Sequence, residues 1–214
     1  MMIYIKGFKM RRMAFTMIEL VFVIVVLGIL AALAMPRLDR DIRQEAADNV
    51  LSAIRYTQHL ALTDNKHKFN IHDWQKALWQ IRFPTSGSGS YTIGTNMDYV
   101  NNIDINEAAI DPANGKIMHS TAANASPNID ITKKYGINSI IFNGCKGQSA
   151  SSAKHIAFDN LGRPHRGVTQ GATNTYATYV NNGNCQITFN SPAFNSSFTI
   201  EIKQETGYAF IVGV

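Results

Sequence analysis

The sequence predicts an α+β fold in which a long N-terminal helix packs on a mainly antiparallel β head. Residues 15–62 form first an apolar run and then an amphipathic pattern of helical period, with one internal proline, Pro36. From residue 78 onwards, apolar residues alternate with polar ones in short runs separated by Gly, Asn, Pro and Ser. These patterns place one long helix before a set of short strands joined by turns.

Residues 15–36, FTMIELVFVIVVLGILAALAMP, are apolar apart from Thr16 and Glu19. A helix rises about 1.5 Å per residue, so roughly 20 apolar residues cross the hydrocarbon of a bilayer. The run is long enough, and we therefore expect it to be a transmembrane helix. Basic residues flank it on both sides: Lys6, Lys9, Arg11 and Arg12 before it, and Arg37 after it.

Glu19 needs a positively charged partner, because an acid inside a membrane helix costs about 2.5 to 3.5 kcal/mol on insertion scales. The apolar run itself contains no cation. Cleavage of the chain between Ala14 and Phe15 would supply one, since the new α-amino group of Phe15 would lie about one helical turn from Glu19.

These residues resemble the N-termini of the type IV pilins and the type II secretion pseudopilins. Such proteins carry a short basic leader, a small residue before the cleavage point, a segment of the form FTxIEL and a long apolar helix. Here the leader is 1–14, the segment is Phe15–Leu20, and Pro36 lies where many pilins place a helix-kinking proline. Ala14 departs from the family pattern, which usually has Gly at this position.

The resemblance implies how the residues act. A prepilin peptidase and methyltransferase would cleave between Ala14 and Phe15 and methylate the amine of Phe15. Phe15 and Glu19 would then direct assembly, with Glu19 paired to the amine of a neighbouring subunit.

Two other interpretations of the same stretch stay open. A secretory signal peptide has a basic start, an apolar core of about 7 to 15 residues and an A-x-A exit, and Ala32-Leu33-Ala34 fits that exit. Against it, the apolar run is long for a signal peptide and contains an acid near its start. A plain membrane anchor explains the length but assigns no role to Glu19.

The net positive charge of the chain comes largely from the leader, where basic residues favour one orientation in a membrane. Four of its 20 Lys and Arg residues belong to the leader, so the remainder carries 16 basic against 15 acidic residues, a net charge of +1 instead of +5. Positive residues hold a leader on the cytoplasmic side of the membrane. The remaining basic residues are scattered along the chain, and no nucleic-acid partner is expected.

The chain has two cysteines, Cys145 and Cys185. An even number in an exported protein favours a disulfide, and the loop of about 41 residues that it closes would stabilise the fold by roughly 4 kcal/mol. Two free buried thiols are the alternative. A zinc site is not favoured, because neither cysteine has a second one nearby.

Residues 37–62 are predicted to continue the helix as an amphipathic segment that packs on the head. Pro36 has no N–H and its ring crowds the preceding turn, so a kink or local melting is expected near 28–36. The apolar stripe recurs every four residues and has a wider second row: Leu38, Ile42, Ala46, Val50 and Ile54, with Ala47, Leu51, Leu60 and Ala61.

Residues 63–214 are predicted to form the head. The helix is expected to end near Thr63-Asp64-Asn65. Trp74 is expected to anchor the turn that follows, in which His67 and His72 lack the further ligands that a metal site needs. Strands are expected at 79–83, 91–93, 139–142, 156–158, 185–189, 198–203 and 208–212, with an exposed loop at 166–184.

Residues 94–136 are predicted to be mainly loop. Their spacing of acids is not that of an EF-hand, so a solvated loop is favoured and no metal site is assigned. Five side chains offer oxygen ligands of the kind found in calcium loops of some major pseudopilins: Asp98, Asp104, Asn106, Glu107 and Asp111.

No catalytic motif is present in the sequence, so neither enzyme activity nor a cofactor is expected. Two signatures, FDxxGRP at 158–164 and TGxxxxV at 206–212, are similar to the heads of H-type minor pseudopilins. The resemblance implies a minor pseudopilin, a structural subunit of a type II secretion pseudopilus. Its alternative is a type IV pilus or competence subunit whose head binds DNA or a surface.

The resemblance also implies where the protein acts. It would cross the bacterial inner membrane once, with the head 63–214 in the periplasm. Its partners would be the prepilin peptidase and methyltransferase, the membrane, and other pilin or pseudopilin subunits that pack through the N-terminal helix.

Overall fold

The computed structural model describes residues 16–71, 73–100, 102–145, 154–168, 180 and 183–213, and for residues 34–41 it describes the backbone alone. The chain divides into two compact units, one ending at Leu38 and the other spanning Asp39–Val214. We refer to the second unit as the head from here on; it comprises the predicted head 63–214 and the part of α1 from Asp39 onwards. The leader 1–14, Phe15 and His72 lie outside the described residues.

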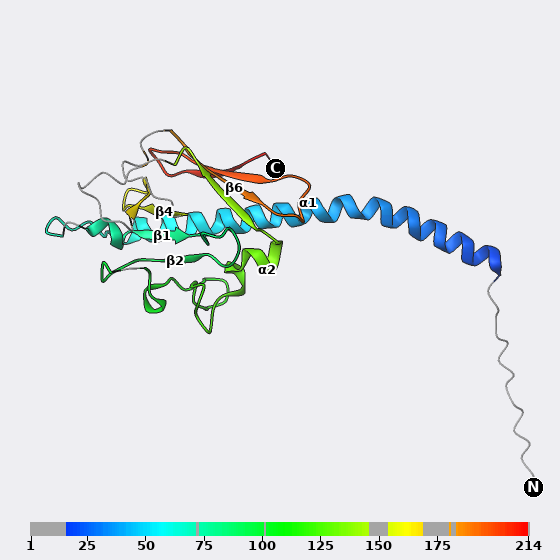
Figure 1. The fold of residues 1–214 in the computed structure, drawn as a ribbon, viewed down its shortest axis with the longest axis horizontal. Coiled ribbons are helices and arrows are strands. Elements are labelled where there is room, and N and C mark those ends of the chain that lie inside the picture. The colour runs from blue at the N-terminus through cyan, green and yellow to red at the C-terminus, as the bar shows by residue number, and fades with distance from the viewer. Residues whose placement is uncertain are drawn as a thin grey trace, which may run out of the picture. The chain divides into compact units, whose positions relative to one another are not determined.

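The helix α1 (Met17–Thr63) is the first element of the chain and contributes residues to both units (Figure 1). Its 47 residues match the predicted helix of 15–62 closely at both ends. The backbone stays helical through residues 28–36, where the sequence predicts a kink or local melting. The side chain of Pro36 lies outside the described part, and the kink stays a prediction.

Within the head, α1 buries one face in the hydrophobic core. The predicted stripe is confirmed from Ala46 onwards, whereas Ile42 is 39% exposed and Leu38 lies outside the described side chains. Small residues dominate the start of this face, so the sheets can approach the helix backbone closely. Its buried members are Ala46, Ala47, Val50, Leu51, Ala53, Ile54, Thr57 and Ala61.

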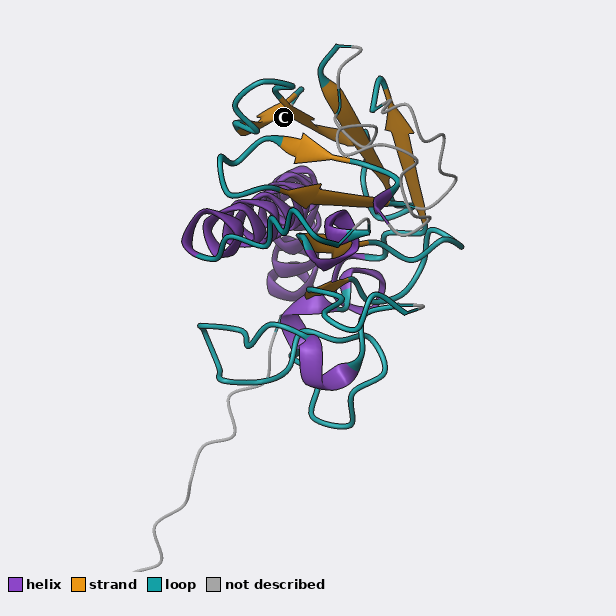
Figure 2. Ribbon diagram, turned by 90° about the vertical axis from the view of Figure 1, so that its left-hand side faces the viewer, coloured by secondary structure: helices purple, strands orange, loops and turns teal. Residues whose placement is uncertain are grey.

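The head is α+β with two antiparallel sheets, as the sequence predicts for the fold class. The first sheet has the order β2-β1-β4-β5 and the second β3-β6-β7-β8. Figure 2 shows the strands on one side of the head and the irregular loops, with the short helix α2, on the other. The strands are β1 (Trp79–Arg82), β2 (Thr92–Gly94), β3 (Ser139–Asn143), β4 (His155–Phe158), β5 (Pro164–His165), β6 (Cys185–Asn190), β7 (Phe198–Ile202) and β8 (Ala209–Val212).

The second sheet has the alternation expected of a sheet with one wet face. In β6 and β7, buried and partly exposed residues alternate at every position. Phe189 of β6 lies opposite Phe198 of β7, and their rings stack with centroids 5.0 Å apart. This apolar face joins the core formed with α1.

The first sheet differs, because both of its faces are covered. Ile81, Ile93 and Ile156 are fully buried in the main core. On the opposite face lie Gln80 and His155, which are also buried, although they are polar. Alternation in the sequence therefore predicts the strands correctly but not the burial of their polar positions.

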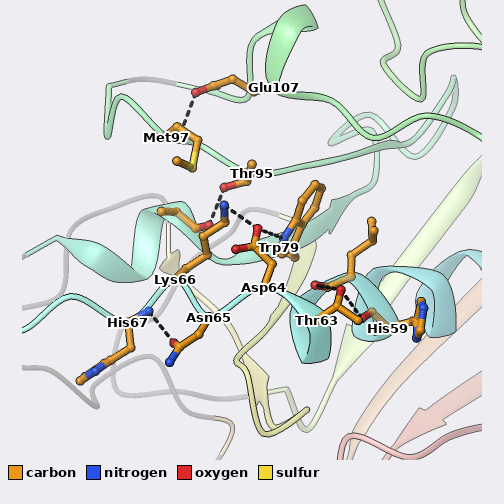
Figure 3. A network of polar contacts seen from close by, with 12 residues as sticks. His59, Thr63, Asp64, Asn65, Lys66, His67, Trp79, Thr95, Met97 and Glu107 are labelled. Carbon is orange, nitrogen blue, oxygen red and sulfur yellow. Dashed lines mark hydrogen bonds and ion pairs between the residues drawn. The ribbon is translucent and has the colours of Figure 1, made fainter.

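The C-terminal end of α1 is tied to β1 by the turn that the sequence predicts (Figure 3). The carboxylate of Asp64 accepts a hydrogen bond from Trp79 Nε1 at 2.9 Å and pairs with Lys66 Nζ at 2.6 Å. Burial raises the pKa of Asp64, but the hydrogen bonds from Lys66 and Trp79 outweigh it and leave the pKa below its usual value. Trp74 is buried and its ring contacts His67, which confirms the predicted aromatic anchor.

Several short elements are not predicted from the sequence. The helix α2 (Ile131–Tyr135) begins at Asp130, whose carboxylate accepts from the backbone N–H of Lys133, and it ends at Gly136 with φ +69°. Two 3₁₀ turns, Ile105–Glu107 and Pro127–Ile129, and the two-residue strand β5 are also unpredicted. A third 3₁₀ turn, Trp74–Ala77, lies where the sequence predicts a turn anchored by Trp74. Within the predicted exposed loop 166–184, Val168 and Val180 are buried, and 169–179 and 181–182 lie outside the described residues.

Candidate functional site

The apolar part of α1 presents a continuous exposed surface among the described residues. Every described side chain from Thr16 to Leu33 is exposed, and only Thr16 and Glu19 among them are polar. At the start of the helix, Thr16 Oγ1 accepts a hydrogen bond from the backbone N–H of Glu19 at 3.3 Å. Such a contact satisfies one of the free N–H groups at a helix N-terminus. The Glu19 side chain is exposed and free to meet a group from another molecule.

No helix in the described part of the chain is both long and apolar enough to cross a membrane. Of the predicted span 15–36, side chains are described for residues 16–33. Ala14 and Phe15, the predicted cleavage point and amine, lie outside the described residues, so the pairing of Glu19 with Phe15 stays a prediction.

The two cysteines are joined in a disulfide between Cys145 and Cys185, as predicted. Cys145 follows β3, and Cys185 opens β6, its neighbour in the second sheet. Their Cα atoms lie 4.2 Å apart, and both residues are buried. The disulfide therefore closes the long connection that contains the first sheet's β4 and β5, and it has a structural role.

The FDxxGRP signature forms a turn built around the carboxylate of Asp159. Its Oδ1 accepts hydrogen bonds from the backbone N–H groups of Leu161 and Arg163, at 3.0 and 2.9 Å. Its Oδ2 accepts from Arg163 Nε at 2.8 Å and lies 3.4 Å from His165 Nε2. Asp159 and His165 are both buried, so the turn keeps a charged carboxylate inside the fold by surrounding it with donors.

The pKa values in this turn follow from that arrangement. Burial raises the pKa of Asp159, but hydrogen bonds from His165 and Arg163 outweigh it and hold the pKa well below its usual range. Burial is the main cause that lowers the pKa of His165, although Asp159 acts against it. These contacts fix the backbone of the turn, so the role of Asp159 is structural.

The two C-terminal signatures meet at α1. Gln58 Nε2 donates to the carbonyl oxygens of Gly162 and Thr206, at 2.9 and 3.0 Å. Gly207 packs directly against the carbonyl of Gly162, so that a Cβ at residue 207 would overlap it. The sequence singles out both turns, but it does not show that one side chain of α1 holds them together.

The acids of the 94–136 segment mainly bond to the loop's own backbone and amides. Glu107 accepts from the N–H of Met97 at 2.7 Å (Figure 3). It also accepts from the N–H of Asp104 at 3.0 Å. Asp111 accepts from Ser126 Oγ and from the N–H of Ala113, at 2.5 and 2.9 Å. In the described part of the chain, no group of three or more His, Cys, Asp or Glu side chains is placed to hold a metal ion.

The polar face of the first sheet contains the residues that sequence reasoning missed. Arg82 lies directly opposite His155 in the pairing of β1 with β4, so their side chains share one face. Both line a groove, together with residues from the loops that follow β1 and β2. Their only signal in the sequence is a cation or histidine within a strand, which does not reveal whether the face is buried.

Comparisons of the chain with protein-family models, with curated proteins and with solved structures found no match.

Proposed function

We propose that the protein is a pilin-like subunit, and specifically a minor pseudopilin of a type II secretion system. After removal of the leader 1–14, the stretch 15–36 anchors it in the inner membrane with the head in the periplasm. The same helix then packs against the helices of neighbouring subunits and forms a short fibre that supports protein export.

The observation that carries the proposal is the exposed apolar surface of α1. Residues 16–33 are exposed on every side of the helix, and a helix that is apolar all round requires an apolar environment such as lipid or neighbouring helices. A simple anchor requires no acid, whereas the chain places Glu19 near the start of this surface. The FTxIEL segment supports an assembly role because it combines the acid with a predicted free amine one turn away.

The head adds a second argument. It has its own core, a disulfide suited to an oxidising compartment, and an α+β architecture in which the second half of α1 is one wall of the core. This arrangement suits a subunit whose helix enters a fibre while its head folds separately. A type IV pilus or competence subunit would share all these features, and the genes beside this one would distinguish the systems.

Substitution of Glu19 by Ala tests the assembly role. The variant should insert and be cleaved normally, because an acid is removed from the apolar stretch. It should fail to join the fibre, since the amine of a neighbour would lose its partner, a change that costs about 3 to 5 kcal/mol when the pair is buried. The measurement is disulfide crosslinking between tagged copies that carry Val21→Cys and Leu27→Cys, two exposed positions of α1.

Asp48→Ala is the matched control, because Asp48 is an exposed acid of the same helix within the head. It should leave crosslinking and secretion unchanged at equal membrane abundance. Normal crosslinking and normal secretion with Glu19→Ala would show that the acid has no part in assembly, and the proposed mechanism would lose its main support.

A further inference from the structure

A groove of about 560 Å³ lies beside the polar face of the first sheet. This volume falls within the range of sites that hold small molecules in proteins. Strands β1, β2 and β4 contribute Arg82, Thr92 and His155, and the segments 83–90, 102–103 and 119–121, together with Lys154, supply the rest of the lining. Paired strands therefore hold Arg82, Thr92 and His155 in position, whereas loops carry the other lining residues.

The charge of the groove has one sign. Arg82 and Lys154 line it, and none of its lining residues is an Asp or Glu. Among the described residues neither cation forms an ion pair with an acid. Burial lowers the pKa of Arg82 to about 10, so the guanidinium keeps its charge at neutral pH. The groove thus presents two uncompensated positive charges.

Arg82 is only partly satisfied by the protein. Its Nε donates to Gln80 Oε1 at 3.0 Å and its Nη1 to Asn102 Oδ1 at 2.5 Å. Both contacts fix the orientation of the guanidinium. Its Nη2 is buried and has no acceptor among the described residues. A buried donor without a partner is costly, and native proteins hold few of them.

His155 provides a second donor of the same kind. The ring is 1% exposed, and Nε2 accepts a hydrogen bond from the backbone N–H of Gly167 at 3.1 Å. The proton of the neutral ring must therefore be on Nδ1, which is buried and has no partner in the described part of the chain. Burial, together with the charges of Arg82 and Arg166, lowers the pKa of His155 to about 3, so the ring stays a neutral N–H donor.

The rest of the lining is rich in hydroxyl groups, which both donate and accept hydrogen bonds. His119 is already engaged with Ile103 and Thr121 and adds no free donor. The hydroxyl residues of the lining are Thr85, Ser88, Ser90, Thr92, Ser120 and Thr121.

We propose that this groove binds a small polyhydroxylated ligand that carries an oxyanion, such as an acidic sugar. The carboxylate or phosphate lies against Arg82, His155 and Lys154, and the sugar hydroxyls face the Ser and Thr side chains. A carboxylate and a phosphate present the same oxyanion chemistry to these donors. The site is independent of the assembly role of α1 and assigns a recognition function to the head.

Isothermal titration of the full-length chain in detergent micelles tests the site with three probes: glucuronate, glucose 6-phosphate and glucose. At least one of the two anionic sugars should bind with a Kd below about 1 mM, at least about tenfold more tightly than glucose. The better anionic probe identifies the oxyanion as a carboxylate or a phosphate. If glucose binds as well as both anions, or none of the three binds, the proposal is overturned.

Variants locate the binding. Arg82→Met and Lys154→Gln should each weaken the better probe about tenfold or more, since each removes a charged donor. Lys116→Gln, at an exposed lysine that does not line the groove, should not change the Kd. If Arg82→Met does not fold, Lys154→Gln decides the outcome. Equal binding by Lys154→Gln and Lys116→Gln would place the ligand elsewhere and overturn the proposal.

Discussion

Replacement of Gly207 by Ala should destabilise the head far more than the same replacement at Gly115. Both glycines have a left-handed backbone, with φ of +65° and +70°. A side chain in that conformation costs about 1 to 2 kcal/mol. The environments differ, because a Cβ at residue 207 would overlap the carbonyl oxygen of Gly162 and lie 2.6 Å from Gln58 Nε2, whereas nothing lies within 4 Å at residue 115.

The extra loss follows from the contacts that must move. Relief of the overlap separates the two turns and breaks the hydrogen bonds from Gln58 to Gly162 and Thr206. Each such bond contributes about 1 kcal/mol. Gly207→Ala should therefore lower the free energy of unfolding by about 3 to 4 kcal/mol and Gly115→Ala by about 1 to 2 kcal/mol. For a chain of this size, the difference in Tm between the variants is about 4 to 8 °C.

Urea unfolding of the full-length chain in mild detergent measures the difference, with the fluorescence of Trp74 and Trp79 as the probe. Both tryptophans lie in the head, so the signal reports its unfolding. Equal losses of stability for the two variants would mean that Gln58 does not clamp the two turns, and the structural role given to both signatures would be wrong.

Two further predictions concern the head. The double variant Cys145→Ala, Cys185→Ala should lower the free energy of unfolding by about 4 kcal/mol, because a bond between residues 40 apart restricts the entropy of the unfolded chain. Labelling of both cysteines by an alkylating reagent in the unreduced, denatured protein would contradict the bond itself. The pKa of Asp159 is lower in the folded state than the unfolded value of about 3.9, so its contribution is present above that pH and is lost as pH falls below it. Asp159→Asn should therefore reduce the fall in the free energy of unfolding between about pH 4 and pH 2. Glu205→Gln, at an exposed acid of the head, should leave that fall unchanged. If both variants lose stability with falling pH as the unchanged chain does, the role given to Asp159 is wrong.

The sequence predicts most of the regular elements, because their patterns are local. The period of the apolar residues in α1 and the alternation in β6 and β7 need no tertiary information, and the structure confirms both. The disulfide is predicted for a different reason: the chain has two cysteines, so Cys145 with Cys185 is the one possible pair.

What the sequence does not predict depends on contacts between distant segments. Gln80 occupies a polar position of a correctly predicted strand, yet it is fully buried. Arg82, on the same face of that strand, donates to Asn102 and lines a groove that includes the distant residues His119 and Lys154. The exposure of Ile42 has the same origin, because the apolar stripe of α1 extends beyond the part that the core covers. Asp111 shows why side-chain roles are hard to predict. An acid in a polar loop could bind a cation or accept hydrogen bonds from the loop itself, and only the contacts in the structure distinguish these roles.

The apolar part of α1, by contrast, can be recognised from the sequence alone. Its residues are conspicuous in the sequence, and the structure adds that the side chains from 16 to 33 are exposed throughout. The proposed function thus depends on a processed N-terminus at Phe15, which lies outside the described residues.

The intact mass of the protein extracted from membranes tests that processing most directly. We predict a chain that begins at Phe15 and carries one added methyl group, because a prepilin peptidase and methyltransferase removes 1–14 and modifies the new amine. A mass that corresponds to a chain beginning at Met35 would indicate cleavage by signal peptidase after Ala34. A chain beginning at Met1 or Met2 would indicate a simple anchor, and either result would contradict the pilin-like function.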